Sequence, residues 1–180
     1  MLLRTLLYKT VPALLFGLFL TFGVRADEVS SQPVRESTRF VDRVVDQASA
    51  SVATAQNALE KALDLIGIRY RRGGTSPETG FDCSGYVSHV FREGLGLYLP
   101  HNSKEMSNSG ERVAKNELQP GDLVFLNTMR RAFSHVGIYL GDNKFIHAPR
   151  AGGKVRVEDM TERYWTKRYN GARRVGSDNE

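Results

Sequence analysis

The hydrophobic pattern changes its period midway along this 180-residue chain. In the first half, apolar residues recur at helical spacing, as at Leu59, Ala62, Leu63 and Ile66 and at Tyr86, Val87, Val90 and Phe91. After Pro120-Gly121 the spacing is typical of β-strands, with a continuous apolar run in DLVFLN and alternation in SHVGIYL. Helices followed by antiparallel strands predict an α+β domain.

Glycines and turn residues divide these segments. We expect one helix to close at Gly67 and a second, with Cys83 in its first turn, to end at Gly94, because glycine favours helix C-termini. A glycine-rich turn region from Gly73 to Gly80 joins the two helices. Further strands are predicted in KFIHA, KVRVEDM and RYNGARRV.

The N-terminus has the features of an export signal. Arg4 and Lys9 precede an apolar run from Val11 to Val24, which is shorter than the roughly 20 residues that span a bilayer. We expect residues 1–26 to be a signal peptide cleaved after Ala26, with an uncleaved membrane anchor as the alternative. The mature protein would then be exported and have no integral membrane segment.

The remaining chain is organised as one domain. Residues 27–53 are polar and rich in Ala and Ser, which predicts a linker, either plain or carrying a short helix; residues 54–176 form the compact domain, and 177–180 are a polar tail. Three of the 25 basic residues and none of the 20 acidic residues lie in the leader, so the mature chain carries a net charge of only +2. Because basic residues form no stripe with interleaved aromatics, nucleic acid is not expected as a partner.

Cys83 is the only cysteine in the chain. Exported proteins usually pair their cysteines, so a lone thiol is either an inert buried group or a reactive one. Here it falls in GFDCSGY, at the predicted start of a helix. The helix dipole there favours an anion, which predicts a thiol pKa below the usual value of about 8.5.

Two histidines lie on adjacent predicted strands. His135 and His147 flank the turn GDN. If those three residues form the loop, Leu140 pairs with Lys144, and His147 lies diagonal to His135 on the same face of the sheet. A two-residue loop would place the two rings on opposite faces. We predict the three-residue loop because it turns the apolar residues of the first strand toward the core.

These three residues supply the parts of a thiol hydrolase. A base takes the thiol proton, and a second polar group orients the base. The alternatives are an inert Cys83, histidines that are only hydrogen-bonded structural residues, and a Cys-His-His zinc site. The zinc site lacks a close-spaced pair of ligands such as CxxC or HxxxH.

Several segments together resemble the NlpC/p60 cell-wall cysteine peptidases. The resemblance spans about Thr54 to Val175 and rests on YRRGGTSPETGFDCSGYV, LPHNS, PGDLVFL, SHVGIYLGDNKFIHA and YWTKRYNGARR. A signal peptide, a linker and a lone catalytic domain are similar to the small murein endopeptidases of Gram-negative bacteria. The resemblance implies a papain-like fold, location in the periplasm or cell envelope, peptidoglycan as the partner, and no metal or organic cofactor.

The resemblance also implies roles for individual residues. Cys83 matches the nucleophile, His135 the general base and His147 the third polar residue. Tyr70 matches a tyrosine near the nucleophile, where its hydroxyl would help the Cys83 amide hold an oxyanion; the alternative is core packing.

Other polar residues near the motifs have less defined roles. Asp82 and Ser84 match family positions beside the nucleophile, with Asp82 as a helix cap or a contact for a substrate amine. His101 departs from the arginine that the family often carries after Leu-Pro, which leaves its role open, and His89 is expected to be structural.

The implied reaction is hydrolysis of stem peptides or cross-links of murein. We expect the bond between D-alanine and meso-diaminopimelate, with the D-glutamyl-diaminopimelate stem bond as the alternative. Arg71 and Arg72, beside the tyrosine motif, either meet substrate carboxylates or belong to a solvated face. A cysteine acyltransferase or amidase on the same scaffold and a non-catalytic cell-wall binding module are the other functional hypotheses.

Overall fold

The computed structural model describes residues 32–176, and the chain divides into two units, residues 1–39 and 40–180. Of the first unit, residues 32–39 are described and are helical. The helical elements are α1 (Gln32–Asp64), α2 (Cys83–Leu95), α3 (Ser103–Met106), η1 (Lys115–Glu117, a 3₁₀ turn) and α4 (Arg163–Thr166). The strands are β1 (Thr75–Ser76), β2 (Gly80–Phe81), β3 (Glu111–Val113), β4 (Leu123–Leu126), β5 (His135–Gly141), β6 (Lys144–His147), β7 (Arg156–Asp159) and β8 (Tyr169–Arg174).

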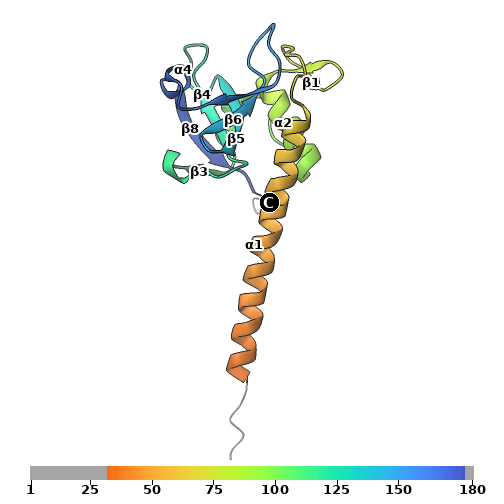
Figure 1. The fold of residues 1–180 in the computed structure, drawn as a ribbon, viewed down its shortest axis with the longest axis vertical. Helices are drawn as coiled ribbons and strands as arrows, with labels where there is room; N and C mark the ends of the chain where they lie inside the picture. The colour runs from red at the N-terminus through yellow and green to blue at the C-terminus, as the bar shows by residue number, and fades with distance from the viewer. Residues whose placement is uncertain (1–31, 177–180) are drawn as a thin grey trace, which may run out of the picture. The chain divides into compact units, whose positions relative to one another are not determined.

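A six-stranded antiparallel sheet forms the centre of the second unit (Figure 1). Its strand order is β3-β8-β4-β5-β6-β7, while β1 and β2 pair separately as a two-stranded ribbon. All four residues of β4 are buried, as the continuous apolar run predicts. Helices that precede an antiparallel sheet confirm the predicted α+β class.

The sheet buries side chains on both faces, because successive residues of a strand point to opposite sides. On one face, Val136 and Ile138 of β5 pack with residues of α1 and α2 in the larger core. On the other face, Tyr139 and Phe145 join a smaller cluster that includes Trp165 of α4. The two histidines of the β5-β6 hairpin belong to this second face.

Helix α2 ends later than expected. Its C-cap is Gly96, which has a φ of 68°, and Gly94 lies inside the helix. A Cβ at Gly94 would come within 2.9 Å of the Ala58 Cα. Gly94 therefore permits the close approach of α1 and α2 and does not end the helix, which corrects the prediction.

Helix α1 differs from the predicted helix in length and in its buried face. It begins at Gln32, so residues 32–53, where a linker with at most a short helix was expected, are helical. Ala58, Ala62 and Leu65 are buried, whereas Leu63 and Ile66, which belong to the apolar set at helical spacing, are 44% and 50% exposed. At Ala58 the helix approaches Gly94 of α2 too closely for a larger side chain.

The predicted signal peptide, residues 27–31 and the tail 177–180 lie outside the described residues. Within residues 32–176, no helix is both long enough and apolar enough to cross a membrane.

The β5-β6 hairpin reaches the expected register by a different route. Gly141, not Leu140, pairs with Lys144, so the predicted Leu140 pairing is wrong. The loop consists of two residues, Asp142 and Asn143, both with positive φ, as in a type I′ turn. A bulge at Leu140 then adds one residue to β5, and Ile138 pairs with Ile146 as the three-residue loop predicted.

Candidate active site

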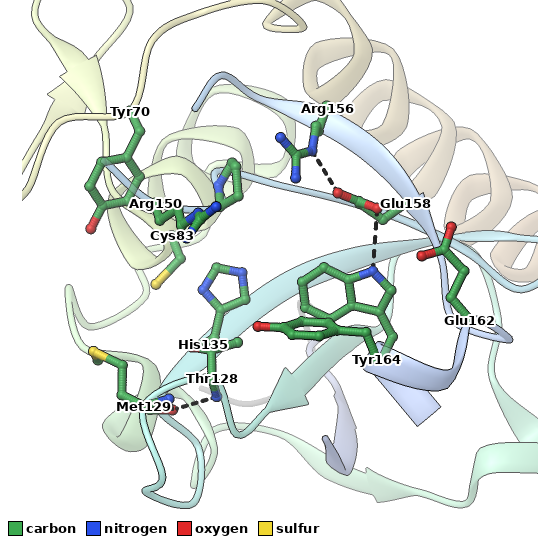
Figure 2. A pocket seen from close by; sticks show the side chains of 13 residues that line it. Tyr70, Cys83, Thr128, Met129, His135, Arg150, Arg156, Glu158, Glu162 and Tyr164 are labelled. Carbon is green, nitrogen blue, oxygen red and sulfur yellow. Dashed lines mark hydrogen bonds and ion pairs between the residues drawn. The ribbon is translucent and has the colours of Figure 1, made fainter. Parts of the chain in front are cut away.

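A cavity of about 500 Å³ lies beside the N-terminus of α2. Figure 2 shows the side chains that line it: Tyr70, Cys83, Thr128, Met129, Ser134, His135, Pro149, Arg150, Arg156, Glu158, Glu162, Tyr164 and Trp165. Three of the predicted site residues, Tyr70, Cys83 and His135, are among them. Asp82, Ser84 and His147 do not line the cavity.

Cys83 is the first residue of α2, which agrees with its predicted place in the first turn of a helix. Its pKa is nevertheless raised to about 11, first by burial and then by the neighbouring Asp82 carboxylate. Backbone N–H groups of Val136, Ser84 and Cys83 itself act in the opposite direction but do not prevail. The expected depression of the thiol pKa is therefore wrong for the free protein, because burial, followed by the charge of Asp82, outweighs the backbone N–H groups at the start of α2.

The two histidines form a buried pair. His135 starts β5 and is 3% exposed, and its Nε2 lies 2.6 Å from Nδ1 of the fully buried His147. The prediction that both rings share one face is confirmed. Because Nε2 of His135 is engaged by His147, Nδ1 is left for the thiol. In Figure 2 the His135 ring and the Cys83 sulfur face the same space.

Burial also controls the charge of the pair. It lowers the pKa of His135 to about 4, with a small opposing contribution from Asp82. Burial, His135 and Arg156 lower the pKa of His147 as well. At neutral pH the free site therefore contains a neutral thiol and two neutral imidazoles, and the tautomers decide which nitrogen can accept a proton.

Trp165 holds both rings in place, a contact that the sequence analysis did not identify. Its indole stacks on His135 at 6.5 Å between ring centroids and meets His147 edge to face at 5.1 Å. The indole Nε1 donates to Glu158 at 3.3 Å. The sequence could have pointed to Trp165, because it is the chain's only tryptophan and lies in one of the segments that carry the resemblance.

Asp82 organises the turn in front of the nucleophile. As N-cap of α2, its Oδ1 accepts hydrogen bonds from Gly85 N–H at 2.7 Å and from the Ser84 hydroxyl at 3.1 Å. His101 Nε2 lies 3.0 Å from the same oxygen, and Gly73 N–H donates to Oδ2. The structure thus gives Asp82 its helix-cap role and gives His101 a contact with that cap.

Tyr70 lies at the cavity wall, and its ring also packs against the core. Burial raises its hydroxyl pKa, as do the nearby Cys83 and Asp82, so the phenol is protonated and can donate a hydrogen bond. Packing and a polar contact, the two roles considered for Tyr70, are therefore compatible.

Other predicted residues lie elsewhere. His89 packs against Phe81 at 5.1 Å between centroids and does not line the cavity. Arg71 and Arg72 are exposed and do not line it either, whereas Arg150 and Arg156 do. Among residues 32–176, no group of three or more His, Cys, Asp or Glu side chains is arranged to hold a metal ion.

The chain is similar to known proteins in sequence and in fold. Residues 67–174 match the model of the NlpC/P60 family. The chain is 38% identical over 145 residues to Murein DD-endopeptidase MepH of Escherichia coli, covering 74% of this chain and 54% of that protein. It is 44% identical over 130 residues to Gamma-DL-glutamyl hydrolase of Bacillus subtilis, covering 72% of this chain and 30% of that protein.

A crystal structure of an NlpC/P60 family protein from Bacillus cereus superimposes with a TM-score of 0.63 at 33% identity, covering 67% of this chain and 40% of that one. The chain thus spans about half or less of the length of these relatives. The family match nevertheless covers more than half of the chain and includes the segments that carry Cys83, His135 and His147. The chain belongs to the NlpC/P60 family.

Proposed function

We propose that this chain is a cysteine endopeptidase that hydrolyses peptide bonds of peptidoglycan. The observation that carries the proposal is the arrangement of Cys83 and His135 in one cavity, with His147 bonded to the far nitrogen of His135. A nucleophile, a base and a group that orients the base are the requirements for covalent hydrolysis. A cell-wall binding module has no need of this arrangement.

The reaction begins when Nδ1 of His135 takes the proton from Sγ of Cys83. The thiolate attacks the scissile carbonyl, and the oxyanion accepts hydrogen bonds from the Cys83 amide and the Tyr70 hydroxyl. His135 then gives its proton to the leaving amine, and an acyl-enzyme remains. Water activated by His135 hydrolyses the thioester and restores the free thiol.

The bond that we assign is the cross-link between D-alanine and meso-diaminopimelate. The relative named Murein DD-endopeptidase favours it. The arginines at the cavity, Arg150 and Arg156, suit the free carboxylates of such peptides. The relative named Gamma-DL-glutamyl hydrolase favours a second candidate, the D-glutamyl-diaminopimelate bond within a stem peptide.

A protein that acts on peptidoglycan must be exported, and we assign this one to the periplasm or cell envelope. Residues 1–26 are proposed to be the signal peptide, so the mature chain starts at Asp27. Sequencing the N-terminus of the protein recovered from the envelope tests this, because an uncleaved anchor retains Met1 or the residue after it.

The test of the activity is incubation of the mature chain with purified cross-linked muropeptide dimers, followed by mass spectrometry. Conversion of dimers to intact monomers supports the cross-link, and release of disaccharide-dipeptide moves the assignment to the stem bond. Products joined to an added amine would reveal an acyltransferase instead. Unchanged muropeptides, with wild type and Cys83→Ser indistinguishable, would overturn the proposed function.

A further inference from the structure

His147 has one ring nitrogen whose environment the proposed triad leaves unexplained. Its Nδ1 contacts His135, but its Nε2 is buried and has no hydrogen-bond partner among the described residues. The atom that it faces is Oε1 of Glu158, at 3.9 Å. A buried N–H without an acceptor costs free energy. The carboxylate of Glu158 is a group that could accept a hydrogen bond from this nitrogen.

Glu158 is held in a fixed position by two donors. Arg156 Nε donates to Oε1 at 2.6 Å, and Trp165 Nε1 donates to Oε2 at 3.3 Å, contacts that Figure 2 marks with dashed lines. In the β6-β7 pairing, Arg156 is opposite His147 and Glu158 is opposite Phe145, so Glu158 lies diagonal to His147 on its face of the sheet. A carboxylate oxygen can accept more than one hydrogen bond, so Arg156 leaves Oε1 available.

The distance of 3.9 Å is too long for a hydrogen bond, so the bond forms only when one of the two side chains moves closer. If Glu158 accepts from Nε2–H, His147 must carry its proton on Nε2 and present a lone pair at Nδ1. That lone pair accepts Nε2–H of His135, which leaves the Nδ1 lone pair of His135 for the Cys83 proton. One carboxylate thereby fixes the tautomers of both rings.

We propose that Glu158 is a positioning residue that sets the two histidine tautomers and stabilises the imidazolium formed on His135. The catalytic part of this proposal rests on the proposed function, because it concerns the proton transfer from Cys83 to His135. In the step concerned, the Sγ–H bond of Cys83 breaks and the Nδ1–H bond of His135 forms, so positive charge appears on His135. Glu158 is the carboxylate that lies 3.9 Å from Nε2 of His147. The charged or titratable groups that act on the two rings or line the same cavity are Tyr70, Asp82, Cys83, Arg150, Arg156, Glu158, Glu162 and Tyr164.

A purely structural role is the competing explanation, since Glu158 also holds Trp165 and Arg156. Glu158→Gln separates the two roles, because an amide keeps the shape and an acceptor but loses the charge. The matched control is Asp159→Asn, which removes the same charge from the next residue of β7, where Asp159 pairs with Lys144 and does not line the cavity.

The first experiment measures alkylation of Cys83 by iodoacetamide from neutral to alkaline pH, which needs no substrate. We expect Glu158→Gln to slow alkylation near neutral pH by about tenfold, equivalent to one pKa unit at His135. The Asp159→Asn variant should stay within about twofold of wild type, and cleavage of muropeptides should fall in parallel for Glu158→Gln alone. Equal alkylation by both variants, or the same loss at every pH, overturns the proposal.

The second experiment uses the wild-type protein and remains available if Glu158→Gln does not fold. NMR of ¹⁵N-labelled histidine should show both His135 and His147 protonated at Nε2. A His147 protonated at Nδ1 overturns the proposal. If wild type cleaves no muropeptide while these tautomers and alkylation rates are as expected, the proposed function fails and the role of Glu158 stands.

Discussion

Nε2 of His135 and Nδ1 of His147 lie 2.6 Å apart, with room for one proton between them. The tautomer of either ring therefore fixes the tautomer of the other. His147 does not line the cavity, so its influence on a substrate passes through His135.

This relationship ranks the histidine variants. His135→Ala should lower kcat/KM by about 10³-fold, because it removes the base. His147→Asn should cost only about tenfold, because the amide oxygen still accepts Nε2–H of His135. Steady-state rates with muropeptides check the order, and His89→Ala serves as control because that ring lies outside the cavity. Equal rates for the His135 and His89 variants would refute it.

The nucleophile gives a second prediction. Cys83→Ser should change the free energy of unfolding by less than about 1 kcal/mol, because the two side chains are nearly isosteric. Hydrolysis should fall to background, because a serine hydroxyl is far less ionised than a thiol at neutral pH. Urea unfolding and muropeptide digestion measure the two effects. Digestion by this variant at a rate near that of wild type would contradict the mechanism.

The buried pair predicts how stability depends on pH. The pKa of His135 is about 4 in the folded chain against 6.5 when unfolded, so its contribution is complete above pH 6.5 and is lost as pH falls toward 4. The pKa of Cys83 is about 11 against 9.0, so its contribution is complete below pH 9 and is lost as pH rises toward 11. His147, whose pKa is also lowered, adds to the loss of stability at acid pH, which we call the acid limb; the loss at alkaline pH is the alkaline limb.

Urea unfolding at a series of pH values checks both limbs. The double variant His135→Gln/His147→Gln should flatten the acid limb, and Cys83→Ser should flatten the alkaline limb. An acid limb as steep in the double variant as in wild type would show that other groups control it.

The contact between α1 and α2 gives the fourth prediction. Gly94→Ala gains about 1 kcal/mol of helix propensity but places a Cβ within 2.9 Å of the Ala58 Cα. Backbone atoms cannot move apart without a cost in free energy, and overpacking costs roughly 1–3 kcal/mol. We therefore expect the free energy of unfolding to fall by about 1 kcal/mol in total. Thermal unfolding measures it beside Glu93→Ala, an exposed site in the same turn. A raised melting temperature for Gly94→Ala would show that the helices separate without cost.

Strands β4 to β8 were predictable because each carries its own signal, whereas β1, β2 and β3, which are two or three residues long, were not predicted. The alternation of His135, Gly137 and Tyr139 against Val136 and Ile138 defines the two faces of β5 before any partner is known. The helices were less predictable, because Leu63 and Ile66 fit a helical stripe as well as Ala58 and Leu65 do. Only the close approach at Gly94 decides which stripe is buried, and that contact is not local in sequence.

In the candidate site, too, residues with a local sequence signal were predicted and features that depend on tertiary contacts were not. Cys83, His135 and His147 have motif signals, and the structure brings the histidines together as predicted. The thiol pKa was predicted with the wrong sign, because burial and the charge of Asp82 outweigh the backbone amides. Glu158 has no motif signal, and its relation to His147 depends on the β6-β7 register.

The bulge at Leu140 links the length of an exposed turn to the chemistry of a buried site. Surface loops ordinarily tolerate insertions and deletions, because nothing inside the protein depends on their length. Here a single-residue indel at Asp142-Asn143 that the bulge did not absorb would rotate His147 to the opposite face of the sheet. The hairpin tip does not line the cavity, yet its residue count sets a geometric constraint on catalysis.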